Sequence, residues 1–265
     1  MTRRFKLAFA IGVLLTGTAF AHDTVLLPEI FVGSSPVALS LTSAEKFPAL
    51  EYGPKASRIS NTKIVGPDAS ARIKVVAESE TALKLALNAN RNGTYVVGVE
   101  LAPHDIELSP DKVAEYFAEI DAPASLRAAY DALPQPRVWR ETYTKHAKAV
   151  VCVARCESPE VLTRALGLRL EFTLLIPNDP RPGQPKAILW RDGKTLPRTA
   201  VAITRADGTR SLEHTDADGA IALPTDGKGP MLLSAVIVDA PEKPGEKFVS
   251  DFATLTLDAT LLSRR

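Results

Sequence analysis

The sequence NGTYVVGVEL, residues 92–101, predicts a turn followed by a strand. Asn-Gly is a strong turn dipeptide, and the residues after it are mainly β-branched or aromatic, the types enriched in strands. Shorter apolar runs of the same kind precede it, at residues 37–42, 63–65, 72–76 and 83–87. Short strands separated by turn residues are typical of an antiparallel β-sandwich.

The same pattern returns after residue 160. Strands are predicted at residues 168–176, 187–190, 200–204, 221–223, 231–238 and 248–257. Asp192-Gly193 and Asp207-Gly208 mark turns among them. We therefore predict a mainly β chain of two Ig-like or transthyretin-like β-sandwich domains, at residues 22–160 and 161–265.

A helical insertion at about residues 109–145 interrupts the first predicted domain. Ser109-Pro110-Asp111 supplies an N-cap residue, a proline at the first helical position and an acid in the first turn. An apolar stripe with the spacing of one helix face follows: Val113, Tyr116, Phe117 and Ile120. A shorter helix is predicted after Pro123, and a third helical turn at Trp139 and Tyr143.

Residues 1–21 have the features of a secretory signal peptide. Basic residues at positions 3, 4 and 6 precede a short apolar run at residues 7–15, and Ala19-Phe20-Ala21 is a cleavage site of the A-x-A type. The apolar run is too short to remain as a membrane span. We expect cleavage after Ala21 and a periplasmic protein that is not embedded in the membrane.

The composition argues against some classes of binding partner. The chain is 45% hydrophobic and 24% charged, which is ordinary for a globular protein. Without residues 1–21 its net charge is about −2, so no basic surface for nucleic acid is expected. Aromatic residues make up 6%, which argues against a stacking groove for sugars or bases.

Cleavage after Ala21 would make His22 the first residue of the mature chain. Its α-amine and its imidazole Nδ1 could then close a six-membered chelate, because both groups lose a proton near neutral pH. Nitrogen donors suit Cu(II) best, with nickel, cobalt and zinc behind. The alternative is that His22 is simply a frayed terminal residue.

Two other histidines are candidate partners of His22. His146 lies just before a predicted buried strand, although Lys145 and Lys148 beside it would oppose a cation. His104 is expected on a loop, where Asp105 could orient its ring. The alternatives are a histidine that caps the strand start and an exposed loop histidine.

Cys152 and Cys156 form a C-x3-C pair. In an exported protein with two cysteines, a disulfide is the expected state, and a turn of this length brings the Cα atoms within range. A thiolate metal site would need further soft ligands. The sequence carries no nucleophile elbow, zinc-protease helix, phosphate loop or dinucleotide fingerprint, so we expect no enzyme.

Taken together, several short motifs in order resemble a known family. They are HDTVLLP (residues 22–28), VALSLTS (37–43), Phe47-Pro48, GTYVV (93–97), IEL (106–108), RETYTKHAK (140–148), TDADG (215–219) and ATLT (253–256). The chain resembles the uncharacterised bacterial family of unknown function that is labelled a periplasmic component of cobalt/nickel transport (NikM-like). The resemblance implies metal uptake. The chain departs from that family at Val25 and near Phe248, where members often carry Trp, and at Ile237, where many carry His.

The terminal histidine also resembles the histidine brace of periplasmic copper proteins, which is an analogy of fold and chelate alone. The favoured hypothesis is a periplasmic protein that binds a divalent transition metal (Cu, Ni or Co) and delivers it to a membrane transporter or outer-membrane receptor. The alternatives are a copper-dependent oxidase and a metal-free module for protein interaction.

Overall fold

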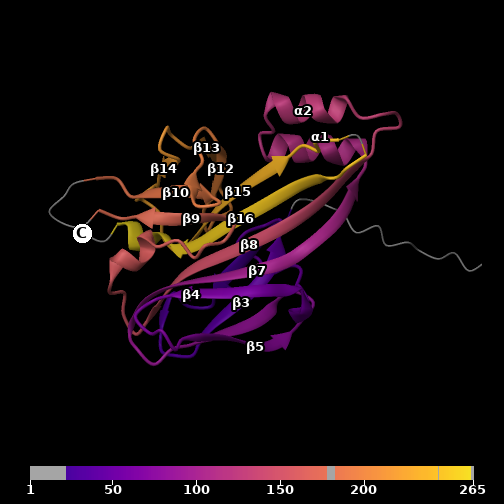
Figure 1. The fold of residues 1–265 in the computed structure, drawn as a ribbon. Helices are drawn as coiled ribbons and strands as arrows, with labels where there is room; N and C mark the ends of the chain where they lie inside the picture. Colours follow the sequence, from indigo (N-terminus) through magenta and orange to yellow (C-terminus); the bar gives the residue numbers. More distant parts are fainter. Residues whose placement is uncertain (1–21, 178–182, 244, 264–265) are drawn as a thin grey trace, which may run out of the picture.

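The protein is mainly β, as predicted, with two short α-helices in the part described here. The computed structural model describes residues 22–177, 183–243 and 245–263. The predicted signal peptide, residues 1–21, lies outside the described residues. The strands within the described residues form three sheets, and the longest strands cross the middle of the molecule (Figure 1).

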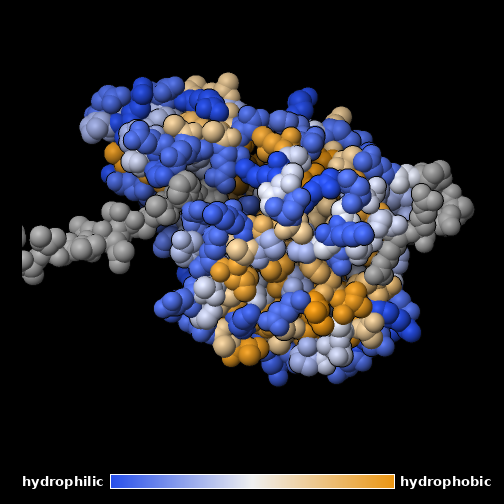
Figure 2. Space-filling model, turned by 180° about the vertical axis from the view of Figure 1, so that it is seen from behind, coloured by the Kyte–Doolittle hydropathy of each residue, from blue (hydrophilic) through white to orange (hydrophobic). Residues whose placement is uncertain are grey.

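The N-terminal sheet is antiparallel and has four strands, in the order β1-β3-β6-β5. Their bounds are β1 Asp23–Pro28, β3 Val37–Ala44, β6 Leu83–Asn88 and β5 Arg72–Glu78. Alternation positions β6: Leu83, Leu85 and Leu87 point into the core, and the residues between them are half-buried. The outer strand β5 is largely exposed, and Val75 and Val76 lie on the surface. In Figure 2 apolar side chains gather over the lower half of the opposite face, among polar ones.

The central sheet has eight strands and follows the order β13-β12-β15-β16-β8-β7-β4, with β2 paired to β8. The bounds are β13 Arg210–His214, β12 Ala200–Thr204, β15 Pro230–Asp239, β16 Phe248–Asp258, β8 Trp139–Val153, β7 Gly93–Leu108, β4 Ile59–Val65 and β2 Val32–Gly33. The pairing of β16 with β8 is parallel, and it joins strands from the two sides of residue 160 in one sheet.

A third sheet contains β9 Leu170–Leu175, β10 Lys186–Arg191, β11 Lys194–Thr195 and β14 Ala220–Ala222. Short 3-10 helices complete the described fold, at Ala56–Arg58, Pro159–Thr163 and Ala259–Leu262. This C-terminal sheet packs on one face of the central sheet and the N-terminal sheet packs on the other, which gives two separate hydrophobic cores.

The alternation in β8 distributes its side chains between the two cores. Ala149 and Val151 belong to the N-terminal core, and Val150 belongs to the C-terminal core. Odd-numbered residues of β8 therefore point toward the N-terminal side, and even-numbered residues point toward the C-terminal side. This parity places Lys145 and His146 on opposite faces of the sheet.

The predicted helical insertion is present as α1 Pro110–Glu119 and α2 Ala124–Asp131. Val113, Tyr116 and Phe117 are buried against an aromatic cluster that includes Trp139 and Phe248, at one end of the central sheet. The prediction of a third helical turn was wrong: Trp139 and Tyr143 lie in β8. Residues four positions apart share one face of a helix and also one face of a strand, so their apolar spacing fits both structures.

Two further details concern the predicted site residues. Cys152 and Cys156 form the predicted disulfide. His104 was expected on a loop but lies within β7, which continues to Leu108 past an irregularity between Leu101 and His104. Pro103 interrupts the apolar run there, so the sequence suggested that the strand had ended.

Candidate functional site

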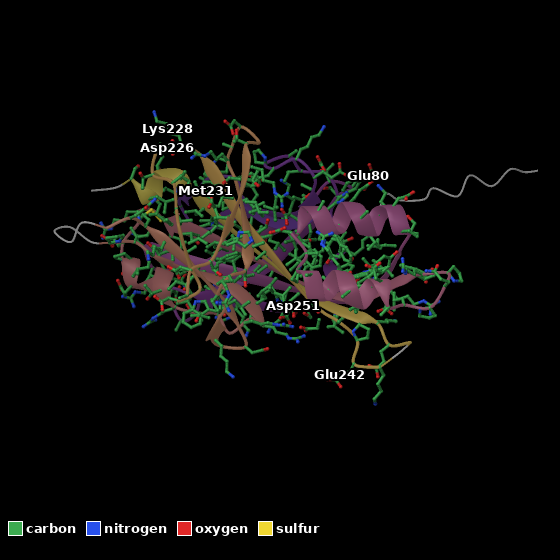
Figure 3. All side chains as sticks on the ribbon, turned by 90° about the horizontal axis from the view of Figure 1, so that it is seen from above. Glu80, Asp226, Lys228, Met231, Glu242 and Asp251 are labelled. Carbon is green, nitrogen blue, oxygen red and sulfur yellow. A yellow bond between two sulfur atoms is a disulfide. The ribbon has the colours of Figure 1, made fainter. Side chains whose placement is uncertain are left out.

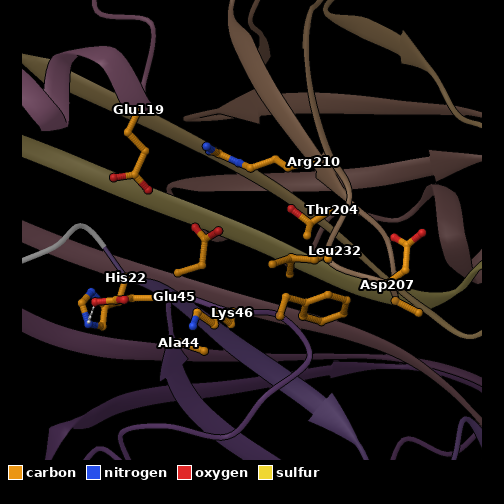
Figure 4. Close-up of a pocket in the computed structure, with 13 residues that line it drawn as sticks. His22, Ala44, Glu45, Lys46, Glu119, Thr204, Asp207, Arg210 and Leu232 are labelled. Atoms are coloured by element: carbon orange, nitrogen blue, oxygen red, sulfur yellow. Dashed lines mark ion pairs between the residues drawn. The ribbon is translucent and has the colours of Figure 1, made fainter.

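A cleft of about 520 Å³ lies on the N-terminal side of the central sheet. Three parts of the chain form its walls: the start of β1 with the loop after β3, the C-terminal end of α1, and the hairpin between β12 and β13. Leu232 of β15 and Phe47 provide its apolar lining and pack together beneath it. Figure 4 shows His22 and Glu45 at one end of the cleft and Asp207 at the other, with Glu119 and Arg210 along one side. Clefts at such junctions are frequent ligand sites.

His22 is held in place at this cleft. The Lys145 ammonium donates a hydrogen bond to the carbonyl oxygen of His22 (2.7 Å), and His22 Nε2 lies 3.2 Å from Glu45 Oε1. The imidazole also packs near the Tyr52 ring, with 5.2 Å between centroids, and only 10% of the side chain is exposed. The structure therefore gives His22 a defined position.

The residues after His22 explain why it has a defined position. β1 begins at Asp23 and pairs with β3 from Ala44. The Thr254 hydroxyl donates to the Thr24 carbonyl oxygen (2.6 Å), which fixes the start of β1 to the central sheet. A residue that continues directly into a paired strand has little freedom to fray.

Acidic side chains outnumber basic ones in the lining of the cleft. Asp23, Glu45, Glu119 and Asp207 face Lys46 and Arg210. Burial, together with the nearby Asp23 carboxyl, raises the pKa of Glu119 to about 7. Burial also raises the pKa of Asp23. Both carboxyl groups are therefore harder to ionise than free ones, although the positive charges of Arg210 and Lys145 oppose the two pKa shifts.

The buried Lys145 belongs to the same set of charges. Burial lowers the pKa of its ammonium to about 8, and the Asp23 carboxylate opposes that shift. The ammonium also lies over the rings of Tyr143 and Phe252, at 5.3 and 5.4 Å from their centroids. Lys145 thus connects the central sheet to the backbone of His22.

His146 lies on the other face of the central sheet. Its Nδ1 is 3.1 Å from Glu100 Oε2, and its Nε2 is 3.3 Å from Asp251 Oδ1. Asp251, in the middle of the molecule (Figure 3), also faces the guanidinium groups of Arg169 and Arg191 at 3.4 Å. His146 therefore belongs to a buried charge network between the sheets, and strand parity directs it away from His22.

His104 lies in β7 directly opposite Tyr143, and the two rings pack edge to face with 5.5 Å between centroids. Its side chain is on the surface. Partial desolvation of the ring and, after it, the Arg58 guanidinium lower the pKa of His104. Arg58 places positive charge near this histidine, an unfavourable setting for a cation.

Within residues 22–177, 183–243 and 245–263, no group of three or more His, Cys, Asp or Glu side chains is arranged to hold a metal ion. The structure thus does not assemble His22, His104 and His146 into one side-chain cluster. In the same part of the chain, no helix has the length and apolar character needed to cross a membrane.

A family model, Domain of unknown function (DUF4198), matches residues 19–239. The chain belongs to this family. A search of curated proteins finds no match. Among solved structures, the D0-D1 domain of Intimin is 12% identical, with 88% of this chain and 97% of that chain covered and a TM-score of 0.23. At that TM-score the similarity carries no argument about this DUF4198 protein.

Sequence reasoning did not identify Lys145, Glu45 or Glu119 as parts of the site of this DUF4198 chain. Lys145 was considered only as a charge that opposes a ligand at His146, and its strand was predicted to begin later. A strand that starts at residue 139 would have placed Lys145 on the face opposite His146. The contacts of His22 with Lys145 and Glu45 join residues far apart in sequence, so no local motif predicts them.

Proposed function

We propose that the mature protein is a periplasmic binding protein for a divalent transition metal (Cu, Ni or Co), with the α-amine and Nδ1 of His22 as its chelate. It would hand this cargo to a membrane transporter or outer-membrane receptor and carry out no catalysis itself. The single observation that carries the proposal is the contact between His22 Nε2 and the Glu45 carboxylate. The disulfide supports an oxidising compartment.

The contact with Glu45 favours one tautomer of His22. A carboxylate accepts a hydrogen bond from Nε2–H, and Nδ1 then carries the lone pair. Nδ1 is the ring nitrogen that can close a six-membered chelate with the α-amine of the same residue. Histidines that bind metals commonly donate their other ring N–H to a carboxylate in this way, which fixes the ring and increases its basicity.

The surroundings of His22 fit a cation as cargo. The cleft contributes more acidic than basic side chains. Nitrogen donors favour Cu(II) over nickel and cobalt. Signal-peptide cleavage after Ala21 is required, because the α-amine exists only after that step.

Equilibrium titration of the processed chain with Cu(II) and Ni(II), against a chromophoric competitor, tests the proposal. His22→Ala should abolish high-affinity binding, and Glu45→Gln should weaken it about 10- to 100-fold. His214→Ala is the matched control, since His214 also contacts one carboxylate, Asp121, at 3.0 Å, but lies at the end of β13. Binding that survives His22→Ala, or that falls equally in His214→Ala, would refute the terminal chelate.

A further inference from the structure

An N-terminal histidine offers a metal two chelates that share the α-amine. One adds Nδ1 and closes a six-membered ring with two nitrogen donors. The other adds the carbonyl oxygen of the same residue and closes a five-membered ring with one nitrogen and one oxygen. The two rings place the ion differently, and they differ in the metals that they favour, because oxygen donors suit Mg, Ca and Mn.

The carbonyl oxygen of His22 is already engaged. It accepts the hydrogen bond from the Lys145 ammonium at 2.7 Å, and Lys145 is only 8% exposed. A cation placed on that oxygen would meet the ammonium charge at short range. The Nδ1 chelate avoids this conflict, because its second donor is on the side chain, which Glu45 holds from the other ring nitrogen.

Lys145 is well placed to keep this arrangement. It lies in the middle of β8, which pairs with β7 on one side and with β16 on the other. Its ammonium lies over the rings of Tyr143 and Phe252. A side chain held by two paired strands and two rings loses little further freedom when the terminus binds, which is the condition for a preorganised site.

We propose that Lys145 is a positioning and specificity-determining residue: by occupying the carbonyl oxygen of His22, it directs the terminal residue to chelate through its two nitrogens and discriminates against ions that prefer oxygen. Lys145 does not touch the ion. The inference rests on the proposed function, since it concerns how the same terminus binds its cargo.

Electron spin echo modulation of Cu(II) tests the inference, because the remote nitrogen of a coordinated imidazole gives its own signal. Lys145→Met should lose this signal, bind Cu(II) about tenfold more weakly, and bind Mn(II) more tightly than the wild type. Lys145→Arg should restore the imidazole signal, since a guanidinium also donates to a carbonyl oxygen.

Lys63→Met is the matched control. The Lys63 ammonium donates to the Gly167 carbonyl oxygen at 2.6 Å, so this variant loses the same type of bond at a site outside the cleft. Its spectrum should equal that of the wild type. If Lys145→Met does not fold, as judged by circular dichroism, Lys145→Leu is measured in its place with the same expectation, because leucine also has no donor for the His22 carbonyl oxygen.

The outcomes separate the two proposals. An imidazole signal that is unchanged in the folded Lys145 variant, with unchanged selectivity against Mn(II), would overturn the role of Lys145 and leave metal binding intact. Loss of the signal in Lys63→Met as well would overturn it too, because the effect would then be one of general destabilisation. No copper binding by the wild type would overturn the proposed function and this inference with it.

Discussion

Lys148→Met should destabilise the fold more than any exposed substitution, because Lys148 joins the two halves of the chain. Its ammonium donates to Glu171 Oε2 at 2.7 Å and to the Phe172 carbonyl oxygen at 2.6 Å. Lys148 and Glu171 are 1% and 2% exposed. The Glu171 carboxylate also accepts backbone N–H groups from residues 166, 167 and 168. The pair thus connects β8 of the central sheet to β9 of the C-terminal sheet.

The expected loss in the free energy of unfolding follows from this geometry. Breaking a buried ion pair from one side costs about 3–5 kcal/mol, because the remaining charge is left without its partner. Three backbone N–H groups still stabilise Glu171, so we expect a value near the lower limit, about 3 kcal/mol. For a chain of this size that corresponds to a fall in Tm of roughly 6–12 °C.

Calorimetry and urea unfolding of the processed, oxidised protein measure this loss. Lys63→Met, which removes a lysine–carbonyl bond nearer the surface, should change the free energy of unfolding by less than about 1 kcal/mol. A double variant, Lys148→Met with Glu171→Leu, should recover part of the loss, since no buried charge then remains. A Lys148→Met variant as stable as Lys63→Met would refute the reasoning, as would a double variant no more stable than the single one.

Three further predictions concern stability. Glu119 has a pKa raised from 4.5 to about 7, so ionising it disfavours the folded state. Glu119→Gln should therefore be more stable than the wild type at pH 8, and this gain should disappear by pH 4.5. An equal gain at both pH values would contradict this. Reducing the Cys152–Cys156 disulfide opens a very short loop, so the free energies of unfolding measured with and without reductant should differ by about 2 kcal/mol. A difference above about 4 kcal/mol would mean that chain entropy is not the main effect. Glu141 is fully buried and accepts a hydrogen bond from Trp139 Nε1 at 2.6 Å. Glu141→Leu should therefore lower the free energy of unfolding by about 2 kcal/mol and weaken the near-UV dichroism of the aromatic cluster. An unchanged spectrum would show that Glu141 does not affect the packing of the helices.

Much of the β-structure followed from local signals. The alternation at residues 83–87 and the Asn-Gly turn before residue 94 gave β6 and the start of β7, and Ser109-Pro110-Asp111 gave the start of α1. These signals depend on side chains within one turn or strand, and tertiary packing agrees with them.

The errors occurred where long-range pairing decides the outcome. β8 begins at Trp139 because it pairs with β7 over fourteen positions and, in parallel, with β16, and neither partner is visible in the sequence of residues 139–145. β1 was not predicted, since DTVLLP has no clear period and gains its strand conformation from β3.

The candidate site was predictable in part. The position of His22 after an A-x-A motif indicated the terminal chelate, because both features are local. The contacts that hold His22 were not predictable, since Glu45 and Lys145 reach it from parts of the chain far apart in sequence. His146 was directed to the opposite face by a single step of strand parity, which could not be applied until the start of β8 was known.

The measurement that tests the central claim most directly is a Cu(II) titration of two chains that differ by one residue: the processed protein that begins at His22, and the same protein with one alanine added before it. The addition leaves every side chain in place and removes only the α-amine of His22 from the chelate. The account predicts tight binding by the first chain and its loss in the second. Equal binding by both chains, or binding by neither, would contradict it.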